Sequence, residues 1–260
     1  MIDRTQLEAI IREAGRIALA GWPGDGHSVE VWDKSPNNPV SASDIAVDNF
    51  LKAELTALLP SAGWLSEETA DAPDRLRGQL VWLVDPIDGT RDFIHGRDGW
   101  AVSVALVSQS RPLFGYLFAP SRRRDEGGEF WHGEAGQGSW RNGQRLAAST
   151  RSGLPGARVP AWKLSNEDSD LAIVPQPNSI ALRMAMVAAD EADLVATLRW
   201  GFEWDIAAAG LIAREAGAEV TDVFGKPLNY NKMDPRAFGV LTTSAAIHSA
   251  AVERLAGRAQ

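Results

Sequence analysis

The stretch that decides the fold is residues 80–93, LVWLVDPIDGTRDF. Its first five residues, Leu80–Val84, are apolar, which is typical of a strand that is covered on both faces. The run leads directly into Asp85, after which Pro86 and Gly89 turn the chain. We therefore expect a buried strand that delivers Asp85 to the end of a sheet, where ligands of α/β proteins usually bind.

Asp88 lies three residues after Asp85 and can point into the same space. Two carboxylates that lie so close repel each other unless a cation is placed between them. After the turn, the backbone N–H groups of Gly89 and Thr90 stand at the start of a helix, which is a natural seat for a phosphate. The stretch thus predicts an acidic pair beside an anion site.

Two further segments place acids at the ends of predicted elements. Glu67 and Glu68 follow a strand-like run at 63–65, and Asp205 begins a predicted helix. Taken alone, Asp205 is an ordinary helix N-cap and the glutamates are an ordinary solvated loop. Joined to the acidic pair above, these acids predict a cage of oxygen ligands suited to Mg²⁺ or Mn²⁺. Zinc is not expected, because the four histidines are scattered along the chain.

The remaining periodicity predicts a mixed α and β fold. Apolar residues at helical spacing predict helices at 4–21, 44–59, 179–194, 205–216 and 245–256. Strands are expected at 63–65, 80–84, 101–107, 112–118, 130–132, 138–140, 220–223 and 240–243, with weaker patterns at 29–32 and 157–164. Ser43 and Ser244 are the expected N-caps of the second and last helices, and Gly217 ends the fourth. Asn142-Gly143 predicts a hairpin turn.

The composition becomes rich in proline near residue 147. We therefore expect two lobes: an N-terminal α+β lobe (1–147) with most of the metal-binding acids, and a C-terminal α/β lobe (148–260) that completes the site. The stretch 150–178 has little periodicity and is the least readable part of the chain.

Composition also limits the class of protein. The 260 residues are 45% hydrophobic, and no apolar stretch approaches the roughly 20 residues that span a bilayer. The charged N-terminus does not resemble a signal peptide, so we expect no membrane partner and a cytoplasmic location. The absence of cysteine excludes disulfides, thiolate nucleophiles and thiolate metal sites. A net charge of −8 disfavours binding to a nucleic acid polymer.

Three segments together resemble one family. Trp64–Thr69, WLSEET, is similar to its glutamate motif, and Trp82–Phe93, WLVDPIDGTRDF, is similar to its aspartate signature. Trp204–Gly217, WDIAAAGLIAREAG, is similar to its C-terminal signature. The family is that of the inositol monophosphatase-like, Mg²⁺-dependent, lithium-sensitive phosphatases. The resemblance covers most of the chain and is weakest at 150–178.

This resemblance implies a layered αβαβα sandwich of the inositol monophosphatase and fructose-1,6-bisphosphatase type. It also implies two or three Mg²⁺ ions in each site, with Mn²⁺ as a substitute and with Li⁺ and Ca²⁺ as inhibitors. The implied metal ligands are Glu67, Asp85, the Ile87 carbonyl, Asp88 and Asp205. Many relatives are dimers, so a homodimer is consistent with the resemblance.

The resemblance further implies roles around the metals. Glu67, Asp88 and Thr90 are the implied catalytic residues, with Thr90 and Glu67 orienting the attacking water. The backbone of Gly89 and Thr90 is implied to hold the phosphate. Lys34 and Asp44 match positions that line the site and touch substrate.

The choice of substrate depends on fewer residues. Inositol monophosphatases typically carry an acid seven residues before the final aspartate, and this chain has Leu198 there. Arg91-Asp92-Phe93 and Gly225–Tyr230, GKPLNY, are similar to segments of 3'(2'),5'-bisphosphate nucleotidases. Arg183 falls where those enzymes often carry a lysine that can meet a second phosphate. The favoured substrate is therefore 3'-phosphoadenosine 5'-phosphate, and the alternative is inositol 1-phosphate.

The stretch between Asn142 and Ser179 is shorter than is usual in the family, and Asn178-Ser179 replaces a Gly-Ser pair. We expect a helix of the second lobe to be missing there, and that lobe shapes the leaving-group pocket. A histidinol-phosphate or a sugar-bisphosphate substrate therefore stays open. A catalytically silent metal- or phosphate-binding regulator is a further alternative, although every expected ligand and Thr90 are present.

Overall fold

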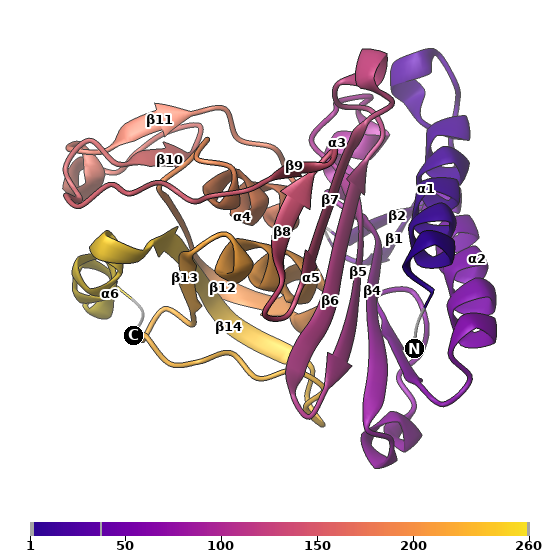
Figure 1. The fold of residues 1–260 in the computed structure, drawn as a ribbon. Helices are drawn as coiled ribbons and strands as arrows, with labels where there is room; N and C mark the ends of the chain where they lie inside the picture. The colour runs from indigo at the N-terminus through magenta and orange to yellow at the C-terminus, as the bar shows by residue number, and fades with distance from the viewer. Residues whose placement is uncertain (1–2, 37, 259–260) are drawn as a thin grey trace.

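The computed structural model describes residues 3–36 and 38–258 and arranges them in five layers. From right to left in Figure 1, these are a helix pair, a large sheet, a second helix pair, a small sheet and a last helix. This order is the αβαβα sandwich that the sequence resemblance implied, so the expected fold class is confirmed.

The first layer contains α1 (Arg4–Ala20) and α2 (Ala42–Leu58), each of which buries an apolar stripe. The helices predicted at 4–21 and 44–59 are thus confirmed. The predicted N-cap of α2 is wrong, because Ser41 and not Ser43 caps the helix. Ser41 and Asp44 form a reciprocal capping box, in which each side chain accepts a hydrogen bond from the other's backbone N–H.

A hairpin links these two helices. Its strands β1 (Val31–Ser35) and β2 (Asn38–Ser41) pair in antiparallel fashion. The weak strand pattern at 29–32 therefore marks a real strand that begins two residues later than predicted. The hairpin brings Lys34 toward the end of the large sheet, where it pairs with Glu67.

The large sheet has seven strands in sequence order. Its first two strands are parallel, and every later pair of neighbours is antiparallel. The strands are β3 (Gly63–Ser66), β4 (Leu80–Asp88), β5 (Ala101–Ser108), β6 (Arg111–Ala119), β7 (Glu129–Glu134), β8 (Gly138–Arg141) and β9 (Gln144–Arg145). The strands predicted in this region are confirmed, and Asn142-Gly143 forms the turn between β8 and β9 with a positive φ at both residues.

Strand β4 carries the deciding stretch and is buried along nearly its whole length. Trp82 contributes to the core beneath α1 and α2, whereas Leu83 contributes to the core beneath the inner helices. This alternation is the two-residue period of a strand. The strand does not stop at Asp85 but continues to Asp88, and its pairing with β5 is interrupted between those two residues. Pro86 lies in the interruption and has no N–H to donate to β5.

The inner helices α4 (Ile180–Ala188) and α5 (Glu203–Glu215) lie between the two sheets (Figure 1). α5 approaches β6 closely at Gly115, where a Cβ atom would lie 2.6 Å from the carbonyl oxygen of Ala208. Only glycine permits so short a distance between helix and sheet. The helix predicted at 205–216 is confirmed, with Gly217 just beyond its C-cap at a φ of 93°.

The helix predicted over 179–194 is wrong beyond Ala188. The chain leaves α4 through a turn in which Asp190 has a φ of 57°. Leu194 already belongs to strand β12 (Leu194–Phe202), which the sequence analysis did not predict. Ala192 and Leu194 are buried, so their apolar character extended the helical pattern past the true end of the helix.

The small sheet has the order β12-β14-β13 and is antiparallel. Its other strands, β13 (Ala218–Thr221) and β14 (Arg236–Ser244), overlap the predictions at 220–223 and 240–243. The last helix, α6 (His248–Ala256), packs its apolar face against this sheet. The prediction that Ser244 caps this helix is wrong, because its hydroxyl donates a hydrogen bond to the carbonyl of Arg151.

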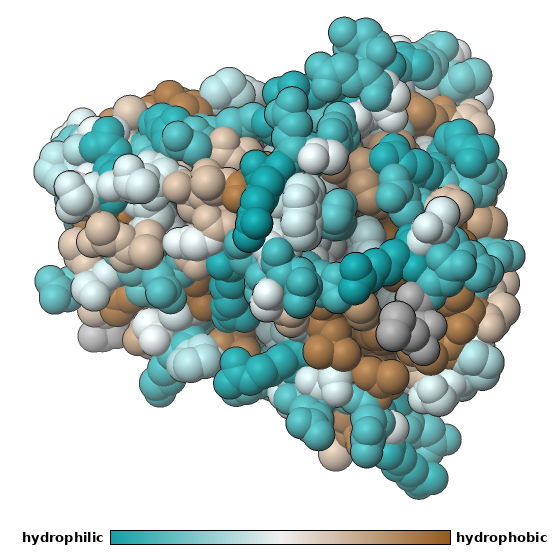
Figure 2. All heavy atoms as spheres, viewed as in Figure 1, coloured by the Kyte–Doolittle hydropathy of each residue, from teal (hydrophilic) through white to brown (hydrophobic). Residues whose placement is uncertain are grey.

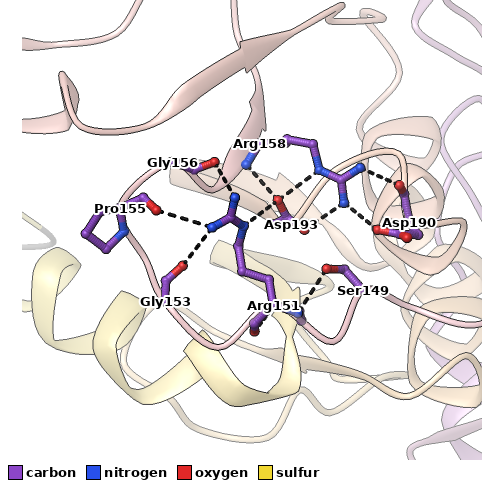
Figure 3. Close-up of polar contacts among 9 residues, drawn as sticks. Ser149, Arg151, Gly153, Pro155, Gly156, Arg158, Asp190 and Asp193 are labelled. Atoms are coloured by element: carbon purple, nitrogen blue, oxygen red, sulfur yellow. Dashed lines mark hydrogen bonds and ion pairs between the residues drawn. The ribbon is translucent and has the colours of Figure 1, made fainter.

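The segment 150–178 forms a two-stranded parallel sheet of β10 (Arg158–Pro160) and β11 (Ala172–Val174). It contains no α-helix, in agreement with the expected loss of a helix there. Figure 3 shows how this segment is attached: the side chains of Arg151 and Arg158 converge on Asp193, just before β12 begins.

In the described part of the chain, no helix is long and apolar enough to cross a membrane. Hydrophilic residues cover much of the face shown in Figure 2, and apolar ones gather in a patch at its lower right. The lobe boundary near residue 147, the cytoplasmic location and the homodimer stay predictions.

Candidate active site

Three carboxylates meet where the ends of β3, β4 and α5 come together. Glu67 follows β3, Asp85 lies within β4, and Asp205 lies in the first turn of α5. One oxygen atom of each lies within 4.8 Å of the corresponding atoms of the other two. The structure thus brings together three of the acids that the sequence analysis placed in one cage.

The electrostatics of this cluster are unfavourable without a cation. Burial raises the pKa of Asp85 and of Asp205 well above the ordinary value, and the negative charge of Glu67 is the next cause for both. Lys34 donates from Nζ to Glu67 Oε1 at 2.8 Å and to Glu68 Oε1 at 2.7 Å. Within residues 3–36 and 38–258, no ion pair reaches Asp85 or Asp205, so neither the buried Asp85 nor the half-buried Asp205 has a cationic side chain paired with it.

The donor set fits a hard divalent metal ion. It consists of carboxylate oxygens only, which is the chemistry that Mg²⁺ and Mn²⁺ prefer. A divalent ion between the three carboxylates would offset the repulsion that, after burial, contributes to the raised pKa values of Asp85 and Asp205. The acidic cluster can therefore hold a metal.

Asp88 lies beside this group, but its carboxylate is engaged elsewhere. Asp88 Oδ2 accepts hydrogen bonds from Ser179 Oγ at 2.5 Å and from the N–H of Ala181 at 2.7 Å, and Oδ1 accepts from the N–H of Ile180 at 3.3 Å. The Asp88 carboxylate thereby accepts hydrogen bonds from N–H groups in the first turn of α4 that have no partner within the helix. Burial raises the pKa of Asp88 to about 6, although these hydrogen bonds act in the opposite direction. Its negative charge also raises the pKa of Asp85.

Thr90 and Asp44 form a second polar group next to the acids. Thr90 Oγ1 lies 3.0 Å from the carbonyl oxygen of Ile87 and 3.3 Å from Asp44 Oδ1, so its hydroxyl proton has two acceptors within reach. Asp44 Oδ2 accepts from the N–H and from the Oγ of Ser41. Burial raises the pKa of Asp44 to about 6. The contact of Asp44 with substrate stays a prediction; in the structure its carboxylate faces Ser41 and Thr90.

Gly89 turns the chain from β4 into the short helix α3 (Thr90–Ile94). It has a φ of 96°, and a Cβ atom there would lie 2.6 Å from the carbonyl oxygen of Gly99 and 2.9 Å from the backbone nitrogen of Ser179. Only glycine fits this position. Gly89 and Thr90 both line the cavity above the carboxylates, so the backbone proposed to hold phosphate lies beside the acids.

Two adjoining cavities give access to these groups. The first, of about 360 Å³, contains the acids, Gly89 and Thr90, and the rings of Trp200 and Phe202 form part of its wall. The second, of about 630 Å³, shares with it the residues Arg91, Asn178, Thr197 and Arg199. It is also lined by His95, Arg97 and Arg183. The acidic cavity therefore opens beside one that is rich in arginine.

The residues that the sequence analysis connected with substrate choice have different positions. Arg183 lines the second cavity, but it is only 8% exposed and donates to the carbonyls of Asn178 and Ser179 at 3.0 and 3.3 Å. Burial lowers the pKa of Arg183. Leu198 packs into the core between the small sheet and α6, away from the acids. Lys226 is exposed and lines neither cavity, although its segment includes the buried residue Tyr230.

The sequence analysis missed the wall that β12 contributes. Thr197, Arg199, Trp200 and Phe202 all line the acidic cavity and all come from this strand. The β-branched and aromatic residues of LVATLRWGF were a usable strand signal. They were overlooked because the preceding apolar residues extended a helical pattern.

Comparisons with known proteins agree with this geometry. A family model described as the inositol monophosphatase family matches residues 2–258. A 3'(2'),5'-bisphosphate nucleotidase CysQ of Escherichia coli strain K12 is 32% identical over 246 residues, which are 88% of this chain and 94% of that protein. An inositol-1-monophosphatase of Mesorhizobium japonicum is 33% identical over 233 residues, 82% of each chain. The solved structure of an IMPase from Thermotoga maritima matches with a TM-score of 0.80 at 25% identity and covers 96% of this chain and 94% of its own.

Proposed function

The chain belongs to the inositol monophosphatase family of phosphoric monoester hydrolases, and on this premise we propose that it is a Mg²⁺-dependent phosphatase of a small phosphorylated metabolite. The observation that carries the proposal is the partly buried cluster of Glu67, Asp85 and Asp205, in which one oxygen of each residue lies within 4.8 Å of those of the others. Such a cluster repels a phosphate ester unless metal ions reverse its charge. Membership of a phosphatase family and an acidic site suited to divalent cations both support metal-dependent hydrolysis of a phosphate ester.

The proposed metal ligands are Glu67, Asp85, the Ile87 carbonyl, Asp88 and Asp205. When bound, Mg²⁺ lowers the pKa of a water molecule and stabilises the charge on the leaving oxygen. We expect two or three ions in each site, Mn²⁺ as a working substitute, and inhibition by Li⁺ and Ca²⁺.

Around the metals, the chain supplies orientation. Thr90, together with Glu67, orients the attacking water. Asp44 accepts a hydrogen bond from the Thr90 hydroxyl at 3.3 Å and is itself held in place by the capping box of α2. This contact fixes the orientation of the Thr90 hydroxyl. The backbone N–H groups of Gly89 and Thr90 donate hydrogen bonds to the phosphate oxygens.

For the substrate, we favour 3'-phosphoadenosine 5'-phosphate. The cavity rich in arginine beside the acids supports a ligand with a second negative group. The likeness to a nucleotidase of E. coli supports the same choice. Inositol 1-phosphate remains the alternative because of the equally similar inositol-1-monophosphatase from M. japonicum.

The test is phosphate release with Mg²⁺ from these two substrates, measured side by side with the Asp88→Asn variant as a control. We expect a preference for the nucleotide of about a hundredfold in kcat/KM, or roughly 2.7 kcal/mol. A preference of that size for inositol phosphate contradicts the proposed substrate but leaves the proposed Mg²⁺-dependent phosphate hydrolysis standing. If neither is hydrolysed but a generic phosphate ester is, and Asp88→Asn abolishes that activity, the chemistry again stands and both substrates are wrong.

A further inference from the structure

Strand β12 contains a bulge beside the acidic cavity. It pairs regularly with β14 up to Thr197 and again from Trp200, so Leu198 and Arg199 together oppose the single residue Gly239. Gly239 has a φ of 69°, and a Cβ atom there would lie 2.7 Å from the carbonyl oxygen of Thr197. Glycine is therefore required opposite the bulge.

The bulge changes which side chain of β12 reaches the acidic cavity. Leu198 packs against the core beneath α6 and lines only the second cavity, whereas Arg199 is exposed and lines both cavities. Bulges beside active sites commonly redirect a side chain in this way. Arg199 thus lies at the junction of the two cavities.

The guanidinium of Arg199 differs from its neighbours in having no partner. Within residues 3–36 and 38–258, Arg199 makes no hydrogen bond and no ion pair. By contrast, Arg183 donates to two backbone carbonyls of its own helix start, Arg97 pairs with Asp92 at 3.3 Å, and Arg91 is also engaged. The donors of Arg199 are therefore free to bind a ligand.

The charge of Arg199 acts on both sides of this junction. It adds to burial, the main cause, in lowering the pKa of Arg183 in the second cavity. It also opposes the rise in the pKa of Asp205 in the acidic cluster, which burial mainly causes. A phosphate ester bound over the acids thus has an unpaired guanidinium within electrostatic reach of its far end.

We propose that Arg199 binds a second phosphate of the substrate, at the junction of the two cavities, while the scissile phosphate lies over the acids. This inference rests on the proposed function and assigns the specificity to Arg199 instead of Arg183. A planar guanidinium can bind a phosphate through two parallel hydrogen bonds. Arg183 holds the carbonyls of Asn178 and Ser179 and so positions the start of α4.

The test compares two substrates that differ only in the second phosphate: 3'-phosphoadenosine 5'-phosphate and adenosine 3'-monophosphate. For Arg199→Gln we expect kcat/KM on the bisphosphate to fall about 100-fold, mainly through KM, because the lost contact forms in ground state and transition state alike. Activity on the monophosphate should stay within about twofold of the wild type. Arg199→Lys should recover part of the loss, since it keeps the charge without the planar fork.

Two controls make the outcome specific. Arg77→Gln removes an exposed arginine that pairs with Asp74 and lines neither cavity, and it should leave both activities unchanged. Binding of the bisphosphate is measured by calorimetry with Ca²⁺ in place of Mg²⁺, and Arg199→Gln should weaken it about 100-fold as well.

Several results overturn the inference. An equal loss on both substrates means that Arg199 acts on the scissile phosphate, and no loss on either means that it does not touch the substrate. A wild-type protein that does not bind the bisphosphate, or does not prefer it over the monophosphate, also overturns the inference and leaves the phosphatase activity standing. If the wild type hydrolyses no phosphate ester at all, the proposed function fails. In that case, the calorimetric affinity of the wild type and of Arg199→Gln for the bisphosphate still tests whether Arg199 binds the second phosphate.

Discussion

At the scale of single residues, the proposed role of Thr90 in orienting the attacking water depends on the surroundings of its hydroxyl. The Thr90 hydroxyl can donate a hydrogen bond either to the carbonyl oxygen of Ile87, at 3.0 Å, or to Asp44 Oδ1, at 3.3 Å. Either choice leaves the lone pairs of Oγ1 free to accept a hydrogen bond from water on the cavity side. The turn at Gly89 places the Ile87 carbonyl beside this hydroxyl, and the capping box of α2 holds Asp44 there.

We predict that Thr90→Val lowers kcat by at least about 100-fold, because the attacking water loses a group that orients it. Thr90→Ser keeps the hydroxyl and should retain most of the activity. Steady-state kinetics on both variants measure this, and unchanged melting temperatures show that the fold is intact. A Thr90→Val enzyme with a kcat near that of the wild type contradicts the assigned role.

The buried acids make a prediction about pH. Burial raises the pKa of both Asp44 and Asp88 to about 6, from an ordinary value of 3.8. Between these values the folded, metal-free protein binds more protons than the unfolded chain, so its stability falls as the pH rises from about 4 to about 6. For Asp44, the rise of the pKa from 3.8 to about 6 corresponds to roughly 3 kcal/mol of folding free energy.

Bound Mg²⁺ supplies the missing positive charge, so its stabilising effect should grow as these acids ionise. We expect the difference in melting temperature between protein with Mg²⁺ and protein with chelator to be small near pH 5 and clearly larger near pH 7.5. Thermal denaturation at a series of pH values measures this. A difference that is flat or that shrinks with rising pH argues against a metal at these acids.

At the scale of elements, the position of β12 depends on an ionic cluster that precedes it (Figure 3). The side chain of Asp193 is nearly inaccessible and accepts from Arg151 Nε at 3.1 Å and from Arg158 Nε and Nη2 at 2.9 and 2.8 Å. Burial alone would raise the pKa of Asp193, but these hydrogen bonds, with others at the site, hold it below its ordinary value. The cluster fixes both the segment 150–160 and the start of the strand that carries Arg199.

Removing the central charge of this cluster leaves two arginines without their partner. We expect Asp193→Asn to destabilise the fold by about 3 kcal/mol, the usual cost of breaking a buried pair. The matched control is Asp234→Asn, because Asp234 also pairs with an arginine but does so on the surface, where solvent screens the pair; this variant should change the stability far less. Urea denaturation of both variants measures the difference. Equal and small effects would show that the cluster does not anchor β12.

Most elements could be predicted from the sequence because their patterns are local. The strand at 80–84 and the helices at 4–21 and 205–216 show periodic apolar residues, and burial of those residues is what holds them in place. β12 could not be predicted in this way. Its start is fixed by Asp193, whose partners Arg151 and Arg158 come from a distant segment, and its bulge is fixed by Gly239 on another strand.

At the scale of the whole molecule, the site joins parts that lie far apart in the sequence. Glu67 and Asp85 come from the large sheet, and Asp205 comes from a helix between the two sheets. The sequence analysis placed these acids together through three motifs. It could not find the cavity wall of β12 or the engagement of Asp88 by α4, because both depend on how the layers pack.

The central claim is that Glu67, Asp85 and Asp205 hold the divalent metal on which phosphate hydrolysis depends. The most direct measurement is Mg²⁺ binding by calorimetry, together with Mg²⁺-dependent phosphate release, on the wild type and on Asp205→Asn. We predict that the wild type binds Mg²⁺ and is inactive in chelator, and that Asp205→Asn loses affinity and turnover together, each by at least about 100-fold. A wild type that stays active in chelator, or an Asp205→Asn variant with undiminished Mg²⁺-dependent turnover, would contradict the claim.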